Sequence, residues 1–479
     1  MAIELFPKLP PVPGLRGQRR APVLGAAGNL FRFFGDPAGT LLRLHREYGE
    51  VAALTEKNPA WIALAGADHV QRVLSDARSF HNLSELPIPA PKDSAPQRLN
   101  VALTAMNGET HRRNRRLMMP AFARPAVQGY RDSMVEVAEQ VMARWRPGEA
   151  ADAHARMVEL AMCVAMKCLY GLDVLRQADE LGALANGWLE GILSVGAILF
   201  PFRVPGTPYA RILSISERFE ARLKRLIEER RASPGGRDVL SLLIAARDDE
   251  AGKLSDAELL GQTGVLFVAA YETTANTLTW TLLLLSQHPR VLGELEEELQ
   301  SALRGATPSL EQVAALPLLD AVVKESMRLL PATAMLFMRR AQEPISLGGL
   351  ELPEGATFLI SPVVAHRDPA LFPDPLEFRP ERWRGLDPGP YQYLPFGAGP
   401  RMCIGAPFAT QSIRILLAMM LQRFRFELAP GARVDRMVRG ITLGPKRGVP
   451  MRLRLPEGPP SPAVPLSGDL HELVKLPRA

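Results

Sequence analysis

Cys403 is the residue whose surroundings point most clearly to chemistry. It lies in LPFGAGPRMCIGAPFA, residues 394–409, with Arg401 two positions before it and glycines at 397, 399 and 405. A metal-binding thiolate needs its negative charge stabilised, and the amides of a tight turn, a nearby cation and the start of a following helix provide this. The glycines permit such a turn, Arg401 supplies the cation, and the apolar run after residue 405 predicts the helix.

A metal bound by Cys403 would have to carry most of its own ligands. A single thiolate cannot complete a zinc or iron–sulfur site, which needs four ligands. The other two cysteines, Cys163 and Cys168, lie in an apolar helical run that is typical of small buried side chains. No histidine-rich set has a suitable spacing. A metal that brings its other ligands with it, as haem iron does, satisfies these constraints.

The decapeptide FGAGPRMCIG, residues 396–405, resembles the haem-binding loop of the cytochromes P450, in which Phe, Gly, Arg, Cys and Gly recur at these spacings. The resemblance implies that Cys403 is the axial thiolate ligand of haem b and therefore also a catalytic residue. It implies further that Phe396 packs beside the sulfur and that Gly405 belongs to the cofactor-binding loop.

Two arginines are candidate partners for the haem propionates. Arg401 lies in the cysteine loop, and Arg339, in MRRA, matches the arginine of an Arg-x-Ala strand in the same family. Cationic side chains are the partners that two carboxylates require.

The octapeptide KESMRLLP, residues 324–331, places Glu325 and Arg328 on one helical face. Taken alone, this spacing is typical of an exposed ion pair. In the resembled family the Glu-x-x-Arg pair meets a further arginine from a proline-rich meander, and FRPERW at 378–383 supplies Arg382. The resemblance therefore implies a buried network of three side chains that braces the cysteine loop and has a structural role.

The segment AAYETTANT, residues 269–277, places an acid and an alcohol, Glu272 and Thr273, within a long apolar helix. Burying such groups without partners costs about 2–7 kcal/mol, and hydrogen bonds to their own backbone are one solution. The segment also resembles the family's oxygen-activating helix, where a local opening lets water and the threonine hydroxyl deliver protons. Glu272 and Thr273 would then be catalytic. Ala270 stands where the family usually has glycine, which favours continuous helix over a kink.

The segment GETHRRNRRLMMPAF, residues 108–122, is strongly basic. Taken alone, it is typical of a nucleic-acid patch or of a solvated helix face. Beside a haem loop it resembles the family's C helix. The resemblance implies that His111 and Arg115, four positions apart, bind a propionate and that Arg112 and Arg116 help to dock an acidic electron donor.

These motifs need a scaffold that is mainly helical, with small sheets near both ends of the chain. Helical patterns dominate from about residue 125 to 330, after a shorter helix at 37–48. Ser255 and Glu258 have the spacing of a capping box that starts a long helix, and Pro289 ends it. Strand patterns occur at 51–64, 345–362 and 450–456.

The predicted fold class is α+β, mainly α with small β-sheets. The resemblance implies a single-domain cytochrome P450 fold over residues 25–456, with the haem between the long central helix and the helix that follows the cysteine ligand. Residues 1–24 are expected to form a proline-rich N-terminal arm. Residues 457–479, also rich in proline, are expected to be a loosely attached C-terminal tail.

Composition limits the possible classes of protein. Apolar residues make up 47% of the 479 and charged residues 23%, which is ordinary for a soluble globular protein. The net charge of +6 is too small to predict a nucleic-acid partner. Three cysteines do not make a disulfide framework, so a reducing cytoplasm is expected. No membrane span is expected, because Glu272 and Asn276 interrupt the most apolar stretch. A monomer is expected.

The resemblance implies a bacterial monooxygenase that activates dioxygen reductively and hydroxylates or epoxidises a substrate. The chain has no dinucleotide-binding fingerprint and no iron–sulfur cysteine cluster. Electrons are therefore expected from a separate ferredoxin, or a flavodoxin, and its reductase. The expected pocket is apolar and suits a fatty acid, terpenoid, steroid or macrolide-like substrate. Its predicted lining residues are Leu99, Leu103, Phe267, Ala270, Ala332, Phe337, Ile441 and Thr442.

Two alternatives stay open at this point. One is a haem-thiolate enzyme that uses peroxide or rearranges an oxygenated substrate; the pair Glu272 and Thr273 argues against it, and the alanine at position 270 keeps it open. The other is a non-catalytic haem protein that only binds an apolar ligand.

Overall fold

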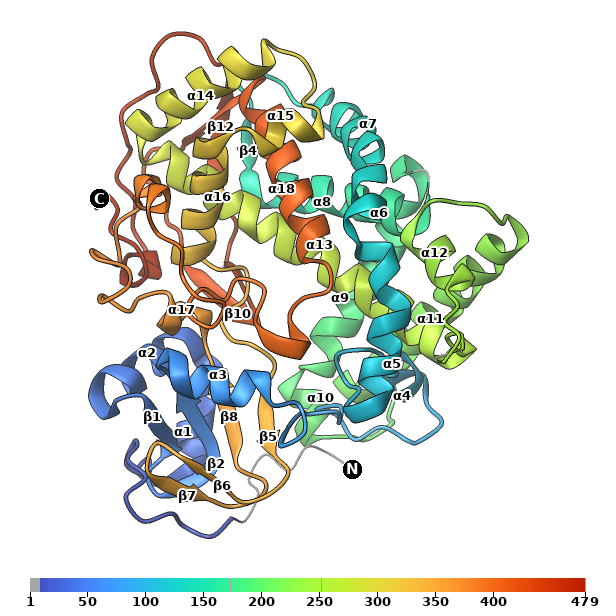
Figure 1. Ribbon diagram of the computed structural model, residues 1–479, viewed down its shortest axis with the longest axis vertical. Helices are drawn as coiled ribbons and strands as arrows, with labels where there is room; N and C mark the ends of the chain where they lie inside the picture. Colours follow the sequence, from blue (N-terminus) through green and yellow to red (C-terminus); the bar gives the residue numbers. More distant parts are fainter. Residues whose placement is uncertain (1–8, 173, 251, 479) are drawn as a thin grey trace.

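The computed structural model describes residues 9–172, 174–250 and 252–478 of the chain. Figure 1 shows a smaller sheet-rich part at one end of the molecule and a larger helical part, with the long helix α13 running through the latter. The mainly helical fold with small sheets that the sequence predicts is confirmed.

The sheet-rich part is built on a five-stranded sheet in the order β1-β2-β8-β5-β3. β1 and β2 form an antiparallel hairpin, β2 runs parallel to β8, and β5 pairs antiparallel with both β8 and β3. Helices α1 and α2 pack against the hairpin. The bounds of these elements are α1 Gly25–Gly35, α2 Pro37–Tyr48, β1 Val51–Thr55, β2 Asn58–Leu64, α3 Ala67–Ser75, β3 Phe80–Asn82, β5 Arg339–Ala341 and β8 Thr357–Ile360.

The helical part packs around α13, which contacts α8, α11, α16 and α18. Its longer helices are α5 Gly108–Met118, α7 Arg131–Met142, α8 Ala153–Tyr170, α9 Val174–Ile192, α11 Pro208–Ala232, α13 Asp256–Ser286, α14 Pro289–Leu303, α16 Pro317–Leu329 and α18 Ala406–Leu421. Its shorter helices are α4 Ala95–Leu99, α6 Arg124–Gly129, α10 Val195–Leu199, α12 Val239–Ala245, α15 Leu310–Ala314 and α17 Pro362–Ala365.

Three smaller sheets complete the fold. One has the order β4-β12-β9 and ties the C-terminal strands to the start of α8, while the other two are hairpins, β6-β7 and β10-β11. Their bounds are β4 Ala150–Asp152, β6 Ile345–Leu347, β7 Leu350–Leu352, β9 Arg425–Leu428, β10 Arg436–Arg439, β11 Thr442–Pro445 and β12 Pro450–Arg454.

Helix α13 begins and ends as the sequence predicts. The Ser255 hydroxyl accepts a hydrogen bond from the Glu258 amide at 3.2 Å, and the Glu258 carboxylate accepts one from the Ser255 amide at 2.8 Å. The helix continues without a break for 31 residues to Ser286, and Pro289 opens the next helix. Its length of about 45 Å is enough to cross the domain. None of the described helices is long and apolar enough to cross a membrane.

The C-terminal segment differs from the prediction of a loosely attached tail. Residues 457–478 pack against the domain, and their apolar side chains are buried because they fill a surface left open by the meander and by β10. The buried residues are Leu466, Leu470, Leu473, Val474 and Leu476. Ser467 also bridges to Arg433. The sequence does not predict this burial, because the prolines interrupt the helical or strand periodicity that indicates a buried segment.

Arg436 connects Asp36, in the N-terminal part of the described chain, with Asp469 and Glu472 near its C-terminal end. Its guanidinium donates to the Glu472 carboxylate at 2.7 Å and to the Asp469 carbonyl at 2.7 Å, and it lies 3.3 Å from the Asp36 carboxylate. Asp36 separates α1 from α2, whereas Asp469 and Glu472 belong to the C-terminal segment. One buried arginine therefore links the sheet-rich part to the last residues of the chain.

Candidate active site

The loop that carries Cys403 has the tight shape that its glycines suggest. Gly397 and Gly399 have φ angles of 66° and 70°, a region that side chains with a Cβ rarely adopt. A Cβ on Gly399 would also collide with the carbonyl of Leu74. The Cys403 amide donates to the Phe396 carbonyl at 2.9 Å, and α18 begins three residues later. The thiol is therefore presented at the start of a buried helix.

The environment of the Cys403 thiol calls for a positive partner. The side chain is exposed in one direction, yet protein atoms surround it on the others, so burial raises the pKa of the thiol. The amides of Gly405 and Ala406 and the guanidinium of Arg115 act in the opposite direction and lower this pKa. Coordination to a metal ion deprotonates a thiol outright, and the position suits such a ligand.

Three arginines and a histidine gather beside this loop. Burial, and then the charge of Arg115, lowers the pKa of Arg401 to about 10. Burial, and then the charge of Arg401, lowers the pKa of Arg339 to about 9. Burial and all three arginines lower the pKa of His111 to about 4. These electrostatic effects indicate that the four side chains lie in one region, where like charges are held near one another.

This cationic cluster has few internal partners. Arg401 donates to the Met106 carbonyl and to the Asn107 side chain, each at 2.6 Å, while its Nε atom is buried without a partner. Arg339 donates to the Phe337 carbonyl at 2.5 Å. Within the described ranges, no carboxylate pairs with the arginines of the cluster. Buried cations of this kind fit an anionic ligand, and a haem, with its two carboxylates and its iron, fits both the cluster and the thiol.

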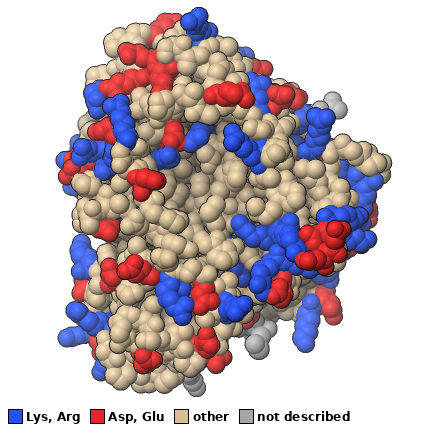
Figure 2. Space-filling view, viewed as in Figure 1, with Lys and Arg blue, Asp and Glu red and all other residues tan. Residues whose placement is uncertain are grey.

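Helix α5 has an inward face and an outward face, as the basic run suggests. His111 is buried and Arg115 half-buried, whereas Arg112 and Arg116 are exposed. Arg116 pairs with Asp248 at 3.1 Å and with Glu250 at 2.9 Å, and Arg112 pairs with Glu109. Figure 2 shows basic and acidic side chains intermixed on the visible face of the molecule. The outward arginines are therefore partly neutralised by their neighbours.

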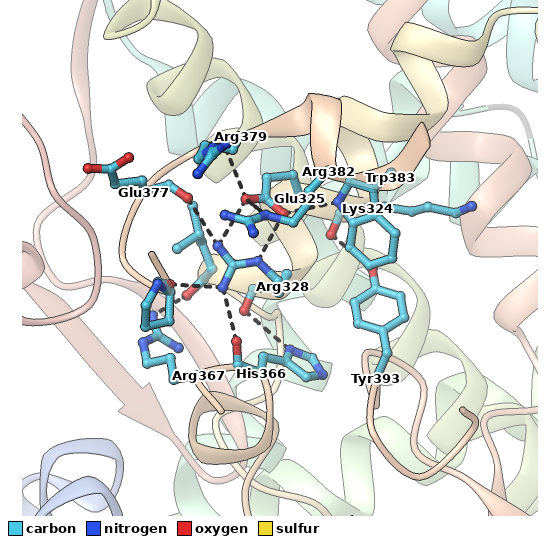
Figure 3. Close-up of polar contacts among 12 residues, drawn as sticks. Lys324, Glu325, Arg328, His366, Arg367, Glu377, Arg379, Arg382, Trp383 and Tyr393 are labelled. Atoms are coloured by element: carbon cyan, nitrogen blue, oxygen red, sulfur yellow. Dashed lines mark hydrogen bonds and ion pairs between the residues drawn. The ribbon is translucent and has the colours of Figure 1, made fainter. Parts of the chain in front are cut away.

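The predicted network around Glu325 is present, with Glu325 and Arg328 fully buried and Arg382 partly buried. Glu325 and Arg328 have no solvent exposure and form a bidentate pair, with both N–O distances 2.9 Å (Figure 3). Arg382 Nε donates to the same carboxylate at 3.0 Å. Two donors that the sequence did not reveal, the Trp383 indole and the Arg379 amide, complete the shell, each at 3.0 Å.

His366 transmits this network to the cysteine loop. Its Nδ1 lies 3.2 Å from the Arg328 carbonyl, and its Nε2 accepts from the Leu394 amide at 2.7 Å. Figure 3 shows His366 beside Arg328 of α16. Leu394 lies two residues before Phe396, so the imidazole bridges α16 to the cysteine loop. Burial, followed by the charge of Arg328, lowers the pKa of His366 to about 3, which keeps Nε2 free to accept. The sequence around this histidine, AHRDP, has no signal that predicts the role.

Glu272 and Thr273 lie on an unbroken stretch of α13, so the local opening expected from the resemblance is not seen. The Thr273 hydroxyl donates to the Ala269 carbonyl at 2.8 Å. Ala269 is exposed and Ala270 half-buried although both lie in the middle of the central helix, and they mark the side of α13 that borders open space. The alanine at position 270 favours continuous helix over a kink.

Glu272 is bonded to the hairpin β10-β11. The Thr442 hydroxyl lies 3.0 Å from Glu272 Oε1 and 2.9 Å from the Arg439 carbonyl oxygen. The Thr442 hydroxyl has one proton to donate, so it donates to the Glu272 carboxylate or to the Arg439 carbonyl, one at a time. Burial raises the pKa of Glu272, assisted by Glu190 and opposed by Thr442 and Arg439. Burial therefore favours the neutral form of the Glu272 carboxyl more than it would be favoured in an exposed glutamate.

The predicted pocket residues divide into two groups. Phe267 and Leu99 are enclosed in the core, with 0% and 2% exposure, and the Phe267 ring lies between the rings of Tyr170 and Tyr271. Leu103 is also buried, at 9%. The more accessible residues are Ala270, Ala332, Ile441 and Phe337, the last with 46% exposure.

Comparison with known proteins identifies the relatives of this chain. The cytochrome P450 family matches residues 15–450. Cyclooctatin synthase of Streptomyces melanosporofaciens is 34% identical over 393 residues, which cover 80% of this chain and 84% of that protein. Cyclooctat-9-en-7-ol 5-monooxygenase of the same organism is 33% identical over 71% of this chain and 75% of its own length. Pentalenene oxygenase of Streptomyces avermitilis is 32% identical over 72% of this chain and 77% of its own length.

The crystal structure of a cytochrome P450DA heme domain matches 93% of this chain and 99% of that chain, with a TM-score of 0.81 and 24% identity. The fold and these relatives define a bacterial oxidoreductase of the monooxygenase class. The chain belongs to the cytochrome P450 family, which implies a haem-iron cofactor and the single-domain fold of that family.

The buried network predicts a large difference between two glutamate substitutions. Glu325→Gln leaves the guanidinium of Arg328 buried without its counter-charge, so the free energy of unfolding should fall by about 3–5 kcal/mol. Glu294→Gln breaks the exposed helical pair with Arg290 and should cost only about 0.3–0.5 kcal/mol. Urea unfolding of both variants measures this. Trp383→Phe removes a single donor and should fall between them, and equal effects of all three would contradict a buried, coupled network.

The raised pKa of Glu272 predicts a pH-dependent effect of Glu272→Gln. The folded chain holds this proton to higher pH than the unfolded chain does, so the stability that the group contributes is full below its ordinary pKa of 4.5. That stability is lost as the pH rises through the folded value. An amide stays neutral, so the variant should gain stability relative to the wild type as the pH rises above 4.5. Urea titrations across this range measure the gain, with Glu297→Gln on the exposed side of α14 as the control. A difference that does not change with pH would contradict the assignment.

Proposed function

We propose that this cytochrome P450 is a haem-thiolate monooxygenase that inserts one atom of dioxygen into a terpenoid, by hydroxylation or epoxidation. The cationic cluster beside an accessible thiol is the observation that carries the proposal, because it supplies both a metal ligand and partners for two carboxylates. The substrate class rests on the names of the relatives, cyclooctat-9-en-7-ol 5-monooxygenase and pentalenene oxygenase, and on the apolar residues near α13. A fatty acid, steroid or macrolide-like molecule is the next choice.

Each residue around the haem has a distinct role in this proposal. Haem b, when bound, supplies an iron at which dioxygen is reduced, and a thiolate ligand favours cleavage of the O–O bond. Cys403 is that ligand, with Phe396 and Gly405 shaping the loop around it. Arg115, Arg339 and Arg401 pair with the propionates. His111 binds a propionate as an N–H donor in this proposal, and the carboxylate offsets the burial and the arginine charges that lower the pKa of His111.

Glu272 and Thr273 deliver protons to the reaction in this proposal. A protonated Glu272 is a proton donor at the open side of α13, and Thr442 fixes the position of its carboxyl. Thr273 keeps its hydroxyl proton on the Ala269 carbonyl, so it accepts a further hydrogen bond from water through its oxygen. The alanine at position 270 keeps this segment helical, and water must therefore approach Thr273 beside the helix instead of through an opening in it.

Electrons reach the haem from separate proteins in this proposal. A ferredoxin, or a flavodoxin, with its reductase is the donor, and the outward arginines of α5 contribute to its docking. Because Arg112 and Arg116 already have acidic neighbours, an acidic donor would compete with Glu109, Asp248 and Glu250 for them. We place the enzyme in the cytoplasm as a monomer.

The assignment of the thiolate has a direct spectroscopic test. The reduced protein with carbon monoxide should show the strongly red-shifted band of a haem-thiolate, and Cys403→Ala should abolish it. Cys163→Ala removes a buried thiol elsewhere and should leave the band unchanged. Circular dichroism verifies that both variants are folded. Survival of the band in Cys403→Ala would refute the proposed ligand.

The source of oxygen separates monooxygenation from its main alternative. A reconstituted system of ferredoxin, reductase and dioxygen should convert a terpenoid substrate, whereas hydrogen peroxide alone should give little product. The alanine at position 270 and the unbroken helix favour the peroxide-driven alternative. Product with peroxide alone, and none with the donor pair, would establish that alternative. Tight ligand binding without product from either source would indicate a haem protein that only binds its ligand.

A further inference from the structure

The N-terminal region presents a surface of large apolar and basic side chains that the proposed reaction does not use. We call it the N-terminal face and define it by Arg16, Arg19, Arg20, Val23, Leu24, Phe31, Arg32 and Phe34. All eight are exposed, and the apolar members are unusually so, with 103% for Val23, 58% for Leu24, 53% for Phe31 and 46% for Phe34. It lies on α1 and the turn before it, at the sheet-rich end of the molecule (Figure 1).

Helix α1 packs against the rest of the fold through the side that faces the hairpin β1-β2. Asn29, Leu30 and Phe33 are buried against the hairpin β1-β2. Leu24 and Phe31 are seven positions apart and therefore share a face of the helix, and Phe31 and Phe34, three apart, are neighbours on it. This face points away from the core. Of the two exposed rings, Phe34 packs beside Phe33 and edge-on against Trp61, with ring centroids 5.4 and 6.3 Å apart, and leaves the rest of its surface open to solvent.

The N-terminal face is held rigidly in place. The amide of the Asn29 side chain donates to the carbonyls of Arg19 and Leu54 and to the Thr55 hydroxyl, at 3.0–3.1 Å. Val23 has a φ of 67°, a strained conformation for a β-branched residue, although its side chain contacts no core. Strained residues persist where the surrounding structure holds them and are frequent at functional sites. In this turn Val23 and Leu24 project outward.

The charged residues of the N-terminal face are all basic. Residues 9–35 contain four arginines and no acidic residue, and none of the four pairs with a carboxylate in the described part of the chain. Glu56 and Lys57, on the β1-β2 turn beside Gln18 and Leu15, border the face and offset each other. A second copy of the chain would bring like charges together, so this face is not self-complementary.

We propose that the N-terminal face docks the enzyme on the surface of an anionic lipid bilayer. Large apolar side chains that project from a helix, flanked by arginines, are the features of segments that lie in the membrane interface. The apolar tips enter the boundary between head groups and acyl chains, and the arginines remain among anionic head groups. A flat protein partner would not accommodate a residue as prominent as Val23, whereas a bilayer is soft enough to do so. Docking is peripheral, since no described helix spans a membrane.

Sedimentation of the full-length protein with lipid vesicles tests this proposal. The protein should bind vesicles of phosphatidylcholine that contain a quarter phosphatidylglycerol, and should bind pure phosphatidylcholine vesicles far less. Phe31→Ser combined with Phe34→Ser should lower the partition coefficient about tenfold or more. Arg19→Gln combined with Arg20→Gln should weaken binding only to the anionic vesicles and should reduce its sensitivity to salt.

Matched controls and rival surfaces make the test decisive. Leu455→Ser and Arg452→Gln change exposed residues of the same kinds elsewhere and should leave binding unchanged. Phe200→Ser combined with Phe202→Ser changes another exposed apolar segment. If only this pair abolishes binding, that segment is the docking site and the proposal is wrong. Equal binding to both kinds of vesicle, no binding to either, or a dimer in solution that Phe31→Ser and Phe34→Ser dissolve would also overturn it.

Discussion

The buried ion pair between Glu325 and Arg328 is the constraint on which the cysteine loop depends. Removing two charges from water costs several kcal/mol per ion, so the pair is tolerable only if every polar atom finds a partner. Arg328 donates to the carbonyls of His366, Pro375 and Glu377, at distances of 2.8–3.1 Å. These carbonyls, together with the donors of the meander, leave the chain between α17 and the cysteine loop very few alternative paths. The shape of the cysteine loop thus depends on the buried ion pair between Glu325 and Arg328 beneath it.

The arginines beside the cysteine loop are arranged in the opposite way, without partners of opposite charge in the described part of the chain. The Glu325 carboxylate is paired with arginines, whereas Arg115 lowers the pKa of Arg401, Arg401 lowers that of Arg339, and none of these three pairs with a carboxylate among the described residues. The protein accepts this repulsion because its α5, β5 and loop backbones are fixed by other contacts. An anionic ligand that relieves the repulsion binds the folded chain and not the unfolded one, so it also stabilises the fold.

Local sequence signals predicted a large part of this structure. The capping box at Ser255 and the proline at 289 define α13, because helix starts and stops depend on residues a few positions apart. The network of Glu325, Arg328 and Arg382 also follows from short motifs once the family is recognised. Such features need no knowledge of how distant segments meet.

Contacts between distant segments could not be predicted in the same way. Thr442 was expected to line the pocket, yet it bonds Glu272 from 170 positions away. His366 meets Leu394 through the path of the meander, and Phe267 turns into a cluster of aromatic rings, although both sides of α13 are equally apolar in sequence. The packing of residues 457–478 depends on a surface that exists only after the rest has folded. Pattern and spacing contain no information about these pairings.

Arg436 has a consequence for the order in which the protein can be made. The ribosome releases the N-terminal arm, α1, α2 and the β1-β2 hairpin first, but β2 pairs with β8, some three hundred residues later, and Asp36 pairs with Arg436, which also binds Asp469 and Glu472. The sheet-rich part thus stays incomplete until the C-terminal segment has left the ribosome. The apolar residues of the sheet-rich part therefore stay exposed until translation ends. The chain is most prone to aggregate during its synthesis.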